Sequence, residues 1–158
     1  MLVLLFESQY VRLLRLARLL GADQEAEDIV SEAFCQLHGR WGDLRSPEAA
    51  AQYLRSIVVN LTRMRLRHLQ VVRGHVPDAP GVAASAEQNA LAGHDRLRLV
   101  AALRQLPRRQ REALVLRYWM DLREAEIAAT MGVSAGAVKT HVYRGMRSLA
   151  RLLRGGHV

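Results

Sequence analysis

Cysteine and long apolar runs are both scarce in this chain of 158 residues. Cys35 is the only cysteine, so a disulfide within the chain and a cysteine-rich zinc site are both excluded. The opening run MLVLLF ends at Glu7 and is too short for a signal-peptide core or a membrane span. We therefore expect a protein of the cytoplasm without membrane insertion.

Aromatic residues are also few, and no segment shows the alternating pattern of a β-strand. Phenylalanine, tryptophan and tyrosine make up 5% of the chain and apolar residues 50%, which favours helices packed through leucine, valine and alanine. Apolar residues recur at helical spacing through most of the sequence. We expect helices over residues 6–20, 24–40, 47–68, 97–106, 108–119, 126–131 and 135–153.

The predicted helices fall into two groups, separated by a stretch with weak periodicity. Residues 70–93 contain Pro77, Pro80 and several glycines and alanines, a composition typical of a linker. The sequence therefore predicts an all-α fold of two small helical domains, residues 1–69 and 94–158, joined by a flexible linker at 70–93.

Basic and acidic residues are distributed unevenly along the chain. The net charge is +8, and lysine contributes to it once, at Lys139. Residues 1–45 carry a net charge of −2, residues 46–73 of +4, residues 74–95 of −3 and residues 96–158 of +9. We therefore expect a polyanionic partner that contacts two separate basic blocks.

The strongest motif lies in residues 122–153. A short predicted helix is followed by Gly132 and Val133, which can form a tight turn, and by Ser134, a good N-cap for a second helix. One side of that second helix is apolar, with Val138, Val142, Gly145, Leu149 and Leu153. The other side presents Gly136, Thr140, Tyr143, Arg144 and Arg147, with Lys139 on its flank. A charged helix face alone is usually just solvated, but the turn, the cap and the order E-I-A-x-x-M-G-V-S together predict a DNA-binding helix-turn-helix.

Three segments, taken in order, resemble one known family. They are AEDIVSEAFCQL (residues 26–37), YLRSIVVN (residues 53–60) and LPRRQREALVLRYWMDLREAEIAATMGVSAGAVKTHVYRGMRSL (residues 106–149). The chain is similar to the sigma-70 superfamily, specifically to the small two-domain extracytoplasmic-function sigma factors of bacteria. The resemblance implies a non-enzymatic, nucleoid-associated protein that binds core RNA polymerase and directs promoter recognition and DNA-templated transcription initiation. An anti-sigma factor is a common further partner in this family.

The resemblance also implies roles for individual residues. The first domain would dock on the polymerase clamp through Asp28, Glu32 and Gln36. It would recognise the −10 element during strand opening through Trp41, Arg45, Asn60, Arg63 and Arg67. The second domain would recognise the −35 element as duplex through Gly136, Lys139, Thr140, Tyr143, Arg144 and Arg147. A further cluster, Arg108, Arg109 and Arg111, is suited to phosphate contacts, which position a protein on DNA without specifying sequence.

Other functions are compatible with parts of the sequence. A stand-alone helix-turn-helix regulator would bind an operator as a dimer and without polymerase. An adaptor that binds polymerase without recognising DNA would leave the second domain without a role. A metalloenzyme could use Glu25, Asp28 and Glu32, but the six histidines are scattered and none completes a metal site nearby in sequence. We therefore expect no catalytic residue, no metal and no cofactor.

Overall fold

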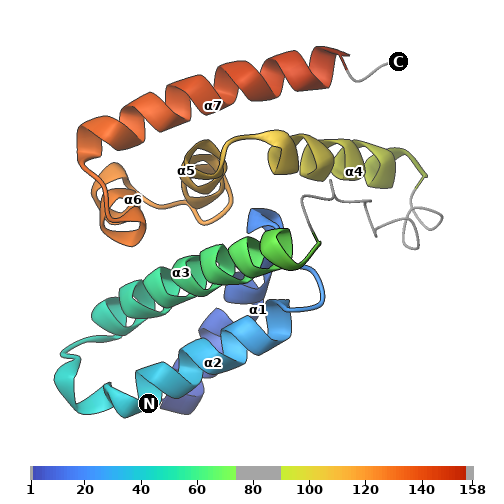
Figure 1. Cartoon of the computed structure of the whole chain (residues 1–158). Coiled ribbons are helices and arrows are strands. Elements are labelled where there is room, and N and C mark those ends of the chain that lie inside the picture. The colour runs from blue at the N-terminus through green and yellow to red at the C-terminus, as the bar shows by residue number, and fades with distance from the viewer. Residues whose placement is uncertain (1, 74–89, 156–158) are drawn as a thin grey trace.

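The computed structural model describes residues 2–73 and 90–155, and over these residues it contains helices and no strands (Figure 1). The α-helices are α1 (Leu2–Leu20), α2 (Ala26–Gly39), α3 (Pro47–Arg73), α4 (Ala90–Gln105), α5 (Arg108–Tyr118), α6 (Glu124–Met131) and α7 (Ala135–Gly155), and η1 (Trp41–Asp43) is a short 3-10 helix. The predicted all-α fold is confirmed. None of the helices in the described ranges combines the length and apolar character that a membrane span requires.

Two helices extend into the predicted linker from either side. The sequence predicts that α3 ends near His68, but the helix continues to Arg73. No glycine or proline occurs between Pro47 and Gly74, so nothing in the sequence interrupts the helical hydrogen bonds earlier. At the other side α4 begins at Ala90. The rest of the predicted linker, residues 74–89, lies outside the described residues.

The first three helices pack against one another and form what we call the N-terminal layer, the lower half of the molecule in Figure 1. Each contributes an apolar face to a common core. Fully buried members of this core include Leu13, Leu16, Ile29, Leu37, Leu54 and Val58. Burial of one such side chain contributes about 1.5–3 kcal/mol to stability.

The turn between α1 and α2 depends on Gly21. Its φ is +124°, a backbone conformation that is essentially restricted to glycine. A Cβ at this position would lie 3.2 Å from Cδ1 of Leu66 on α3. The backbone N–H of Ala22 donates to the carbonyl oxygen of Ala17 at 3.0 Å, which closes the end of α1. The turn thus fixes the angle at which α2 leaves α1.

Replacing Gly21 with alanine should lower the free energy of unfolding by about 1–3 kcal/mol, because the new side chain strains the backbone and crowds Leu66. Urea denaturation followed by circular dichroism measures this change. The matched control is Gly39→Ala at the end of α2, where a Cβ would meet nothing within 4 Å. Equal stability of the two variants would contradict the role assigned to this turn.

The last four helices form the C-terminal layer, with α5 at its centre. Gly145 allows α7 to approach α5 closely, since a Cβ there would lie 3.1 Å from Leu114. The core of this layer includes Leu103, Leu114, Leu116, Ile127, Val138 and Leu149. This packing orients α7 so that one side of it is buried and the other faces solvent.

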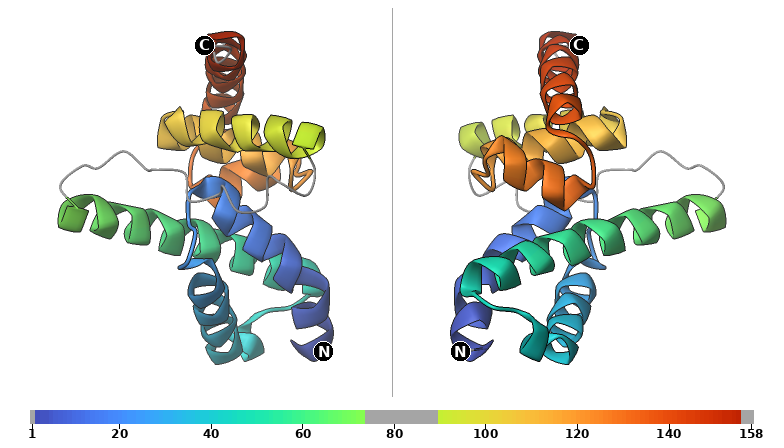
Figure 2. Two further views of the ribbon diagram at one scale, coloured as in Figure 1. Left: turned by 90° about the vertical axis from the view of Figure 1, so that its right-hand side faces the viewer. Right: turned by 90° about the vertical axis from the view of Figure 1, so that its left-hand side faces the viewer.

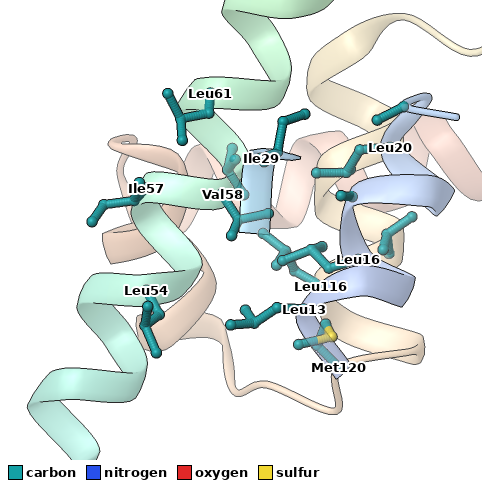
Figure 3. Close-up of a cluster of buried hydrophobic side chains, with 14 of the residues drawn as sticks. Leu13, Leu16, Leu20, Ile29, Leu54, Ile57, Val58, Leu61, Leu116 and Met120 are labelled. Carbon is teal, nitrogen blue, oxygen red and sulfur yellow. The ribbon is translucent and has the colours of Figure 1, made fainter. Parts of the chain in front are cut away.

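The two layers share one apolar core, which the sequence did not indicate. The helix α1 packs against α4 and α5, and α3 packs against α6. Both views in Figure 2 show α1 reaching the C-terminal layer while α3 passes beneath that layer. Figure 3 shows Leu13 and Leu16 of α1 beside Leu116 of α5 and Met120. The chain is therefore folded with its two helical groups in direct contact.

Candidate nucleic-acid interface

The helix-turn-helix is formed by α6, a tight turn and α7, as predicted. Gly132 has a left-handed φ of +73°, and its N–H donates to the carbonyl oxygen of Ala128 at 2.9 Å. Ser134 caps α7, because its hydroxyl accepts the N–H of Ala137 at 3.1 Å. At the start of α6 the carboxylate of Glu126 accepts the backbone N–H of Arg123 at 2.9 Å, and this hydrogen bond lowers the pKa of Glu126. Both helices of the motif thus begin at satisfied caps.

The predicted −35 residues lie together on the outward face of α7. Val138, Gly145 and Leu149 on the opposite face are buried. The six predicted residues are all exposed: Gly136, Lys139, Thr140, Tyr143, Arg144 and Arg147. The guanidinium of Arg147 donates to the hydroxyl of Tyr143 at 3.3 Å and lies 5.8 Å from the centre of its ring. Within the described residues Arg144 makes no hydrogen bond or ion pair, so its donors are available to a ligand.

The predicted −10 residues divide into two groups. Trp41 and Arg45 lie before α3, where Trp41 is half-buried against the core and Arg45 is exposed. Asn60, Arg63 and Arg67 lie in the second half of α3 and share one stripe at helical spacing. Helical rise places the stripe about 20 Å from the start of α3. The structure therefore brings three of the five residues together and leaves the other two at a distance.

Arg63 is the one member of this stripe that is engaged with the C-terminal layer. Its Nε donates to Oε2 of Glu112 at 2.7 Å, and its Nη2 donates to Oε1 at 2.6 Å. The hydrogen bonds to Glu112 raise the pKa of Arg63. Its Nη2 also donates to the carbonyl oxygen of Met131 at 3.3 Å. Asn60 and Arg67, in contrast, are exposed.

The predicted docking residues Asp28, Glu32 and Gln36 form an exposed polar rim on α2, opposite its buried face. Gln36 Nε2 donates to the carboxylate of Glu32 at 3.3 Å. Glu32 also lies 3.7 Å from the guanidinium of Arg65, a surface pair of little energetic weight. Glu25, Asp28 and Glu32 do not form a metal site, because no cluster of three metal-binding side chains occurs in the part of the chain that the structure describes.

The predicted phosphate-contacting arginines do not behave alike. Arg111 donates to the carbonyl oxygens of Leu20, Leu103, Arg104 and Leu106 at 2.9 to 3.1 Å. It therefore ties the ends of α1 and α4 together, and this structural role replaces the phosphate contact expected from its place in an arginine cluster. Arg108 is exposed and lies 3.9 Å from the carboxylate of Glu112, while Arg109 is half-buried.

Several residues at the contact between the layers carry no signal in the sequence. Glu112 is buried beside Arg63, and Arg104 binds both carboxylate oxygens of Asp23. Gln52 donates to the hydroxyl of Thr130 at 3.0 Å. Each pair joins residues at least 49 positions apart, which local spacing cannot relate.

Comparison with known proteins agrees with this geometry. The sigma-70 region 2 family model matches residues 5–71, and the sigma-70 region 4 model matches residues 96–149. The chain is 40% identical over 160 residues to an RNA polymerase sigma-E factor of Streptomyces avermitilis, covering 95% of this chain and 84% of that protein. It is 34% identical over 152 residues to the ECF RNA polymerase sigma factor SigM of Mycobacterium tuberculosis, covering 94% of this chain and 75% of that protein.

A solved structure shows the same fold. The sigma factor RpoE of Bartonella quintana, in complex with the anti-sigma factor NepR, matches with a TM-score of 0.72 and 23% identity, over 97% of this chain and 94% of that chain. Both family regions occur here in order, and relatives more than 30% identical align along nearly the whole chain. The chain therefore belongs to the sigma-70 family as an extracytoplasmic-function sigma factor, a non-catalytic subunit that directs RNA polymerase to initiate transcription.

Proposed function

We propose that this sigma factor divides promoter recognition between its two layers. Residues 1–69 act as region 2, which binds core polymerase and the −10 element, and residues 94–158 act as region 4, which binds the −35 element. Residues 70–93 connect the two. The observation that carries the proposal is the exposed polar face of α7, which is the second helix of a helix-turn-helix and is capped at its N-terminus by Ser134.

The outward face of α7 suits duplex recognition. A B-DNA major groove about 12 Å wide admits one α-helix, and its base edges offer acceptors to arginine and lysine. Arg144 and Lys139 carry donors for these acceptors. Thr140 and Tyr143 add hydroxyl groups, a group type that can donate and accept hydrogen bonds. Arg147, held against Tyr143, is placed to contact a phosphate. Sequence specificity would therefore come mainly from the first three turns of α7.

The N-terminal layer suits a separated DNA strand. Strand opening requires a pocket for an unstacked base and a cationic track for the backbone. The loop at residues 42–47 and the half-buried ring of Trp41 offer the first, and the α3 stripe with Asn60, Arg63 and Arg67 offers the second. The two features lie at different ends of α3, as expected when a strand passes along the helix.

Replacing Arg67 with alanine should weaken binding of a single-stranded −10 oligonucleotide by the holoenzyme to a similar extent for all sequences. Arg67 is exposed and makes no ion pair in the described ranges, so its removal deletes a phosphate contact without unfolding the layer. The slope of log affinity against log salt should fall in magnitude by about 0.7. Anisotropy titrations at several salt concentrations measure this.

The control for Arg67 is Arg15→Ala, since Arg15 is an exposed arginine on α1, a different helix from the one that carries the stripe. It should leave both affinity and salt slope unchanged. An Arg67 variant that matches the Arg15 variant in both quantities would remove Arg67 from the proposed track.

We further propose the remaining partners and the location. The rim formed by Asp28, Glu32 and Gln36 docks on the clamp of core polymerase, because its polar groups surround a firm apolar root of α2. An anti-sigma factor regulates the chain, by analogy with RpoE, which was crystallised with NepR. The protein acts in the bacterial cytoplasm, at the nucleoid.

A binding experiment separates this function from that of a stand-alone regulator. Promoter duplex is titrated with the chain alone, with core polymerase alone and with both together. We expect specific binding only when both are present. Tight, sequence-specific binding by the chain alone would instead favour an operator-binding regulator.

A further inference from the structure

An ion pair that includes a residue of the proposed −10 track holds the two layers together. The side chain of Arg63 is 15% exposed and that of Glu112 is 2% exposed, and two hydrogen bonds of 2.6 and 2.7 Å join them. A bidentate pair shielded from water is stronger and more specific in geometry than a surface pair. Removal of either partner would leave the other charge buried without compensation. The contact therefore favours one defined arrangement of the layers.

Other contacts support the same arrangement. Arg104 of α4 binds the carboxylate of Asp23 at 2.6 and 3.0 Å. Gln52 of α3 donates to the hydroxyl of Thr130 of α6. In Figure 3, Leu13 and Leu16 of α1 lie beside Leu116 of α5 and Met120, so apolar packing also joins the layers. The interface thus combines complementary charges with a shared core, as a specific docking surface does.

The carboxylate of Glu112 lies among arginines from both layers. Arg63 comes from α3 and Arg108 from α5, and the charges of Arg67 and Arg109 also act on Arg108. Guanidinium groups bind carboxylates and phosphates through the same bidentate hydrogen-bond geometry. A nucleic-acid phosphate at Arg63 would need the same donors that Glu112 occupies.

We propose that Glu112 is an internal substitute for a promoter phosphate, which occupies Arg63, holds the C-terminal layer on α3 and masks the −10 track until the layers separate. This inference rests on the proposed −10 role of Arg63. The masking is selective, because the outward face of α7 is exposed in the same arrangement. The free chain thus presents its −35 face and conceals part of its −10 surface.

Promoter geometry requires this separation. The −35 and −10 elements are about 25 base pairs apart by their designation, which corresponds to about 85 Å of duplex. The longest helix in the described ranges, α3, has 27 residues and a length of about 40 Å. With α6 packed on α3, the two recognition surfaces are too close together to reach both elements. The layers must part before a promoter is engaged.

The first arm of the test measures the separation of the layers in the free chain. Arg151→Cys on α7 provides a second labelling site beside Cys35 of α2. Spin labels are attached at both positions, and pulsed electron paramagnetic resonance gives the distance between them. Cys35 is the only native cysteine, so this pair is specific. We expect one dominant, narrow distance distribution for the otherwise native chain and a broad distribution extending to longer distances for Glu112→Gln.

A second variant and a control make this arm decisive. Asp23→Lys breaks the other ion pair, and because the side chain of Asp23 is 54% exposed, this change does not threaten the core. It should open the layers in the same way. Glu27→Gln alters an exposed carboxylate with no ion pair in the described residues and should keep the native distance.

The second arm measures binding of a single-stranded −10 oligonucleotide by the free chain. Glu112→Gln should raise the affinity by about tenfold, the gain expected if the open fraction rises from about one tenth to nearly all molecules. Unchanged distances in both variants, or opening without a gain in affinity, would overturn the proposal. Neither result alters the outcome for Arg67→Ala in the holoenzyme. That experiment tests the −10 assignment, whereas the two arms described here test the masking by Glu112.

Discussion

Replacing both Asp28 and Glu32 with lysine should weaken association with core polymerase by at least about 100-fold. Both carboxylates are exposed on the same side of α2, so the double variant reverses the charge of the docking rim. Like charges placed opposite each other in an interface cost several kcal/mol. The buried side of α2, with Ile29, Ala33 and Leu37, is untouched, so the layer should remain folded. Titration of labelled core polymerase with the chain measures the affinity.

The control for the docking rim makes the same change in net charge elsewhere on the N-terminal layer. Glu27 and Glu48 are exposed, and Glu27 lies on a different side of α2 from the rim. Replacing both with lysine should leave the affinity for polymerase within a few-fold of the native value. Undiminished binding of the Asp28 and Glu32 variant, or equal losses in the two variants, would count against the rim as the docking surface.

Replacing Arg144 with alanine should reduce promoter use by about 1–3 kcal/mol, and only on templates with a matching −35 element. The guanidinium makes no contact within the described residues, so the change removes recognition without a cost to folding. A bidentate contact to a base edge carries this amount of discrimination. Open-complex formation on matched and scrambled −35 templates gives the ratio directly.

Arg154 supplies the matched control for Arg144, because it is exposed in the last turn of the same helix, away from the first three turns. Arg154→Ala should behave like the native chain on both templates. An equal loss on both templates for Arg144→Ala would show that Arg144 contacts phosphate and does not contribute specificity.

Local features of the fold could be predicted because the signals for them are local. Gly132 supplies a left-handed turn, Ser134 supplies an N-cap, and apolar spacing identifies the buried side of α7. The same reasoning places Asp28 and Glu32 on an exposed rim, since the apolar residues Ile29, Ala33 and Leu37 recur at helical spacing on the other side of α2. The all-α fold follows from the same patterns repeated along the chain.

The contact between the layers could not be predicted, because its signals are not local. Glu112 stands in an arginine-rich stretch, where it resembles a surface carboxylate, yet it is buried by Arg63 from 49 residues earlier. Arg111 looks in sequence like its neighbours Arg108 and Arg109, but it alone binds the carbonyl ends of two helices. The role of each of these residues depends on its hydrogen-bond partner, and that partner is brought into reach only by tertiary packing.

Run-off transcription with purified core polymerase tests the central claim most directly. The template carries a promoter that the holoenzyme selects from genomic DNA, and the reactions contain the chain alone, core polymerase alone or both. We expect a discrete transcript only when both are present, and loss of that transcript when the −35 element or the −10 element is scrambled. Absence of the transcript in the complete reaction, or a transcript that is indifferent to both elements, would contradict the assignment of this chain as a sigma factor that recognises a promoter through two separate surfaces.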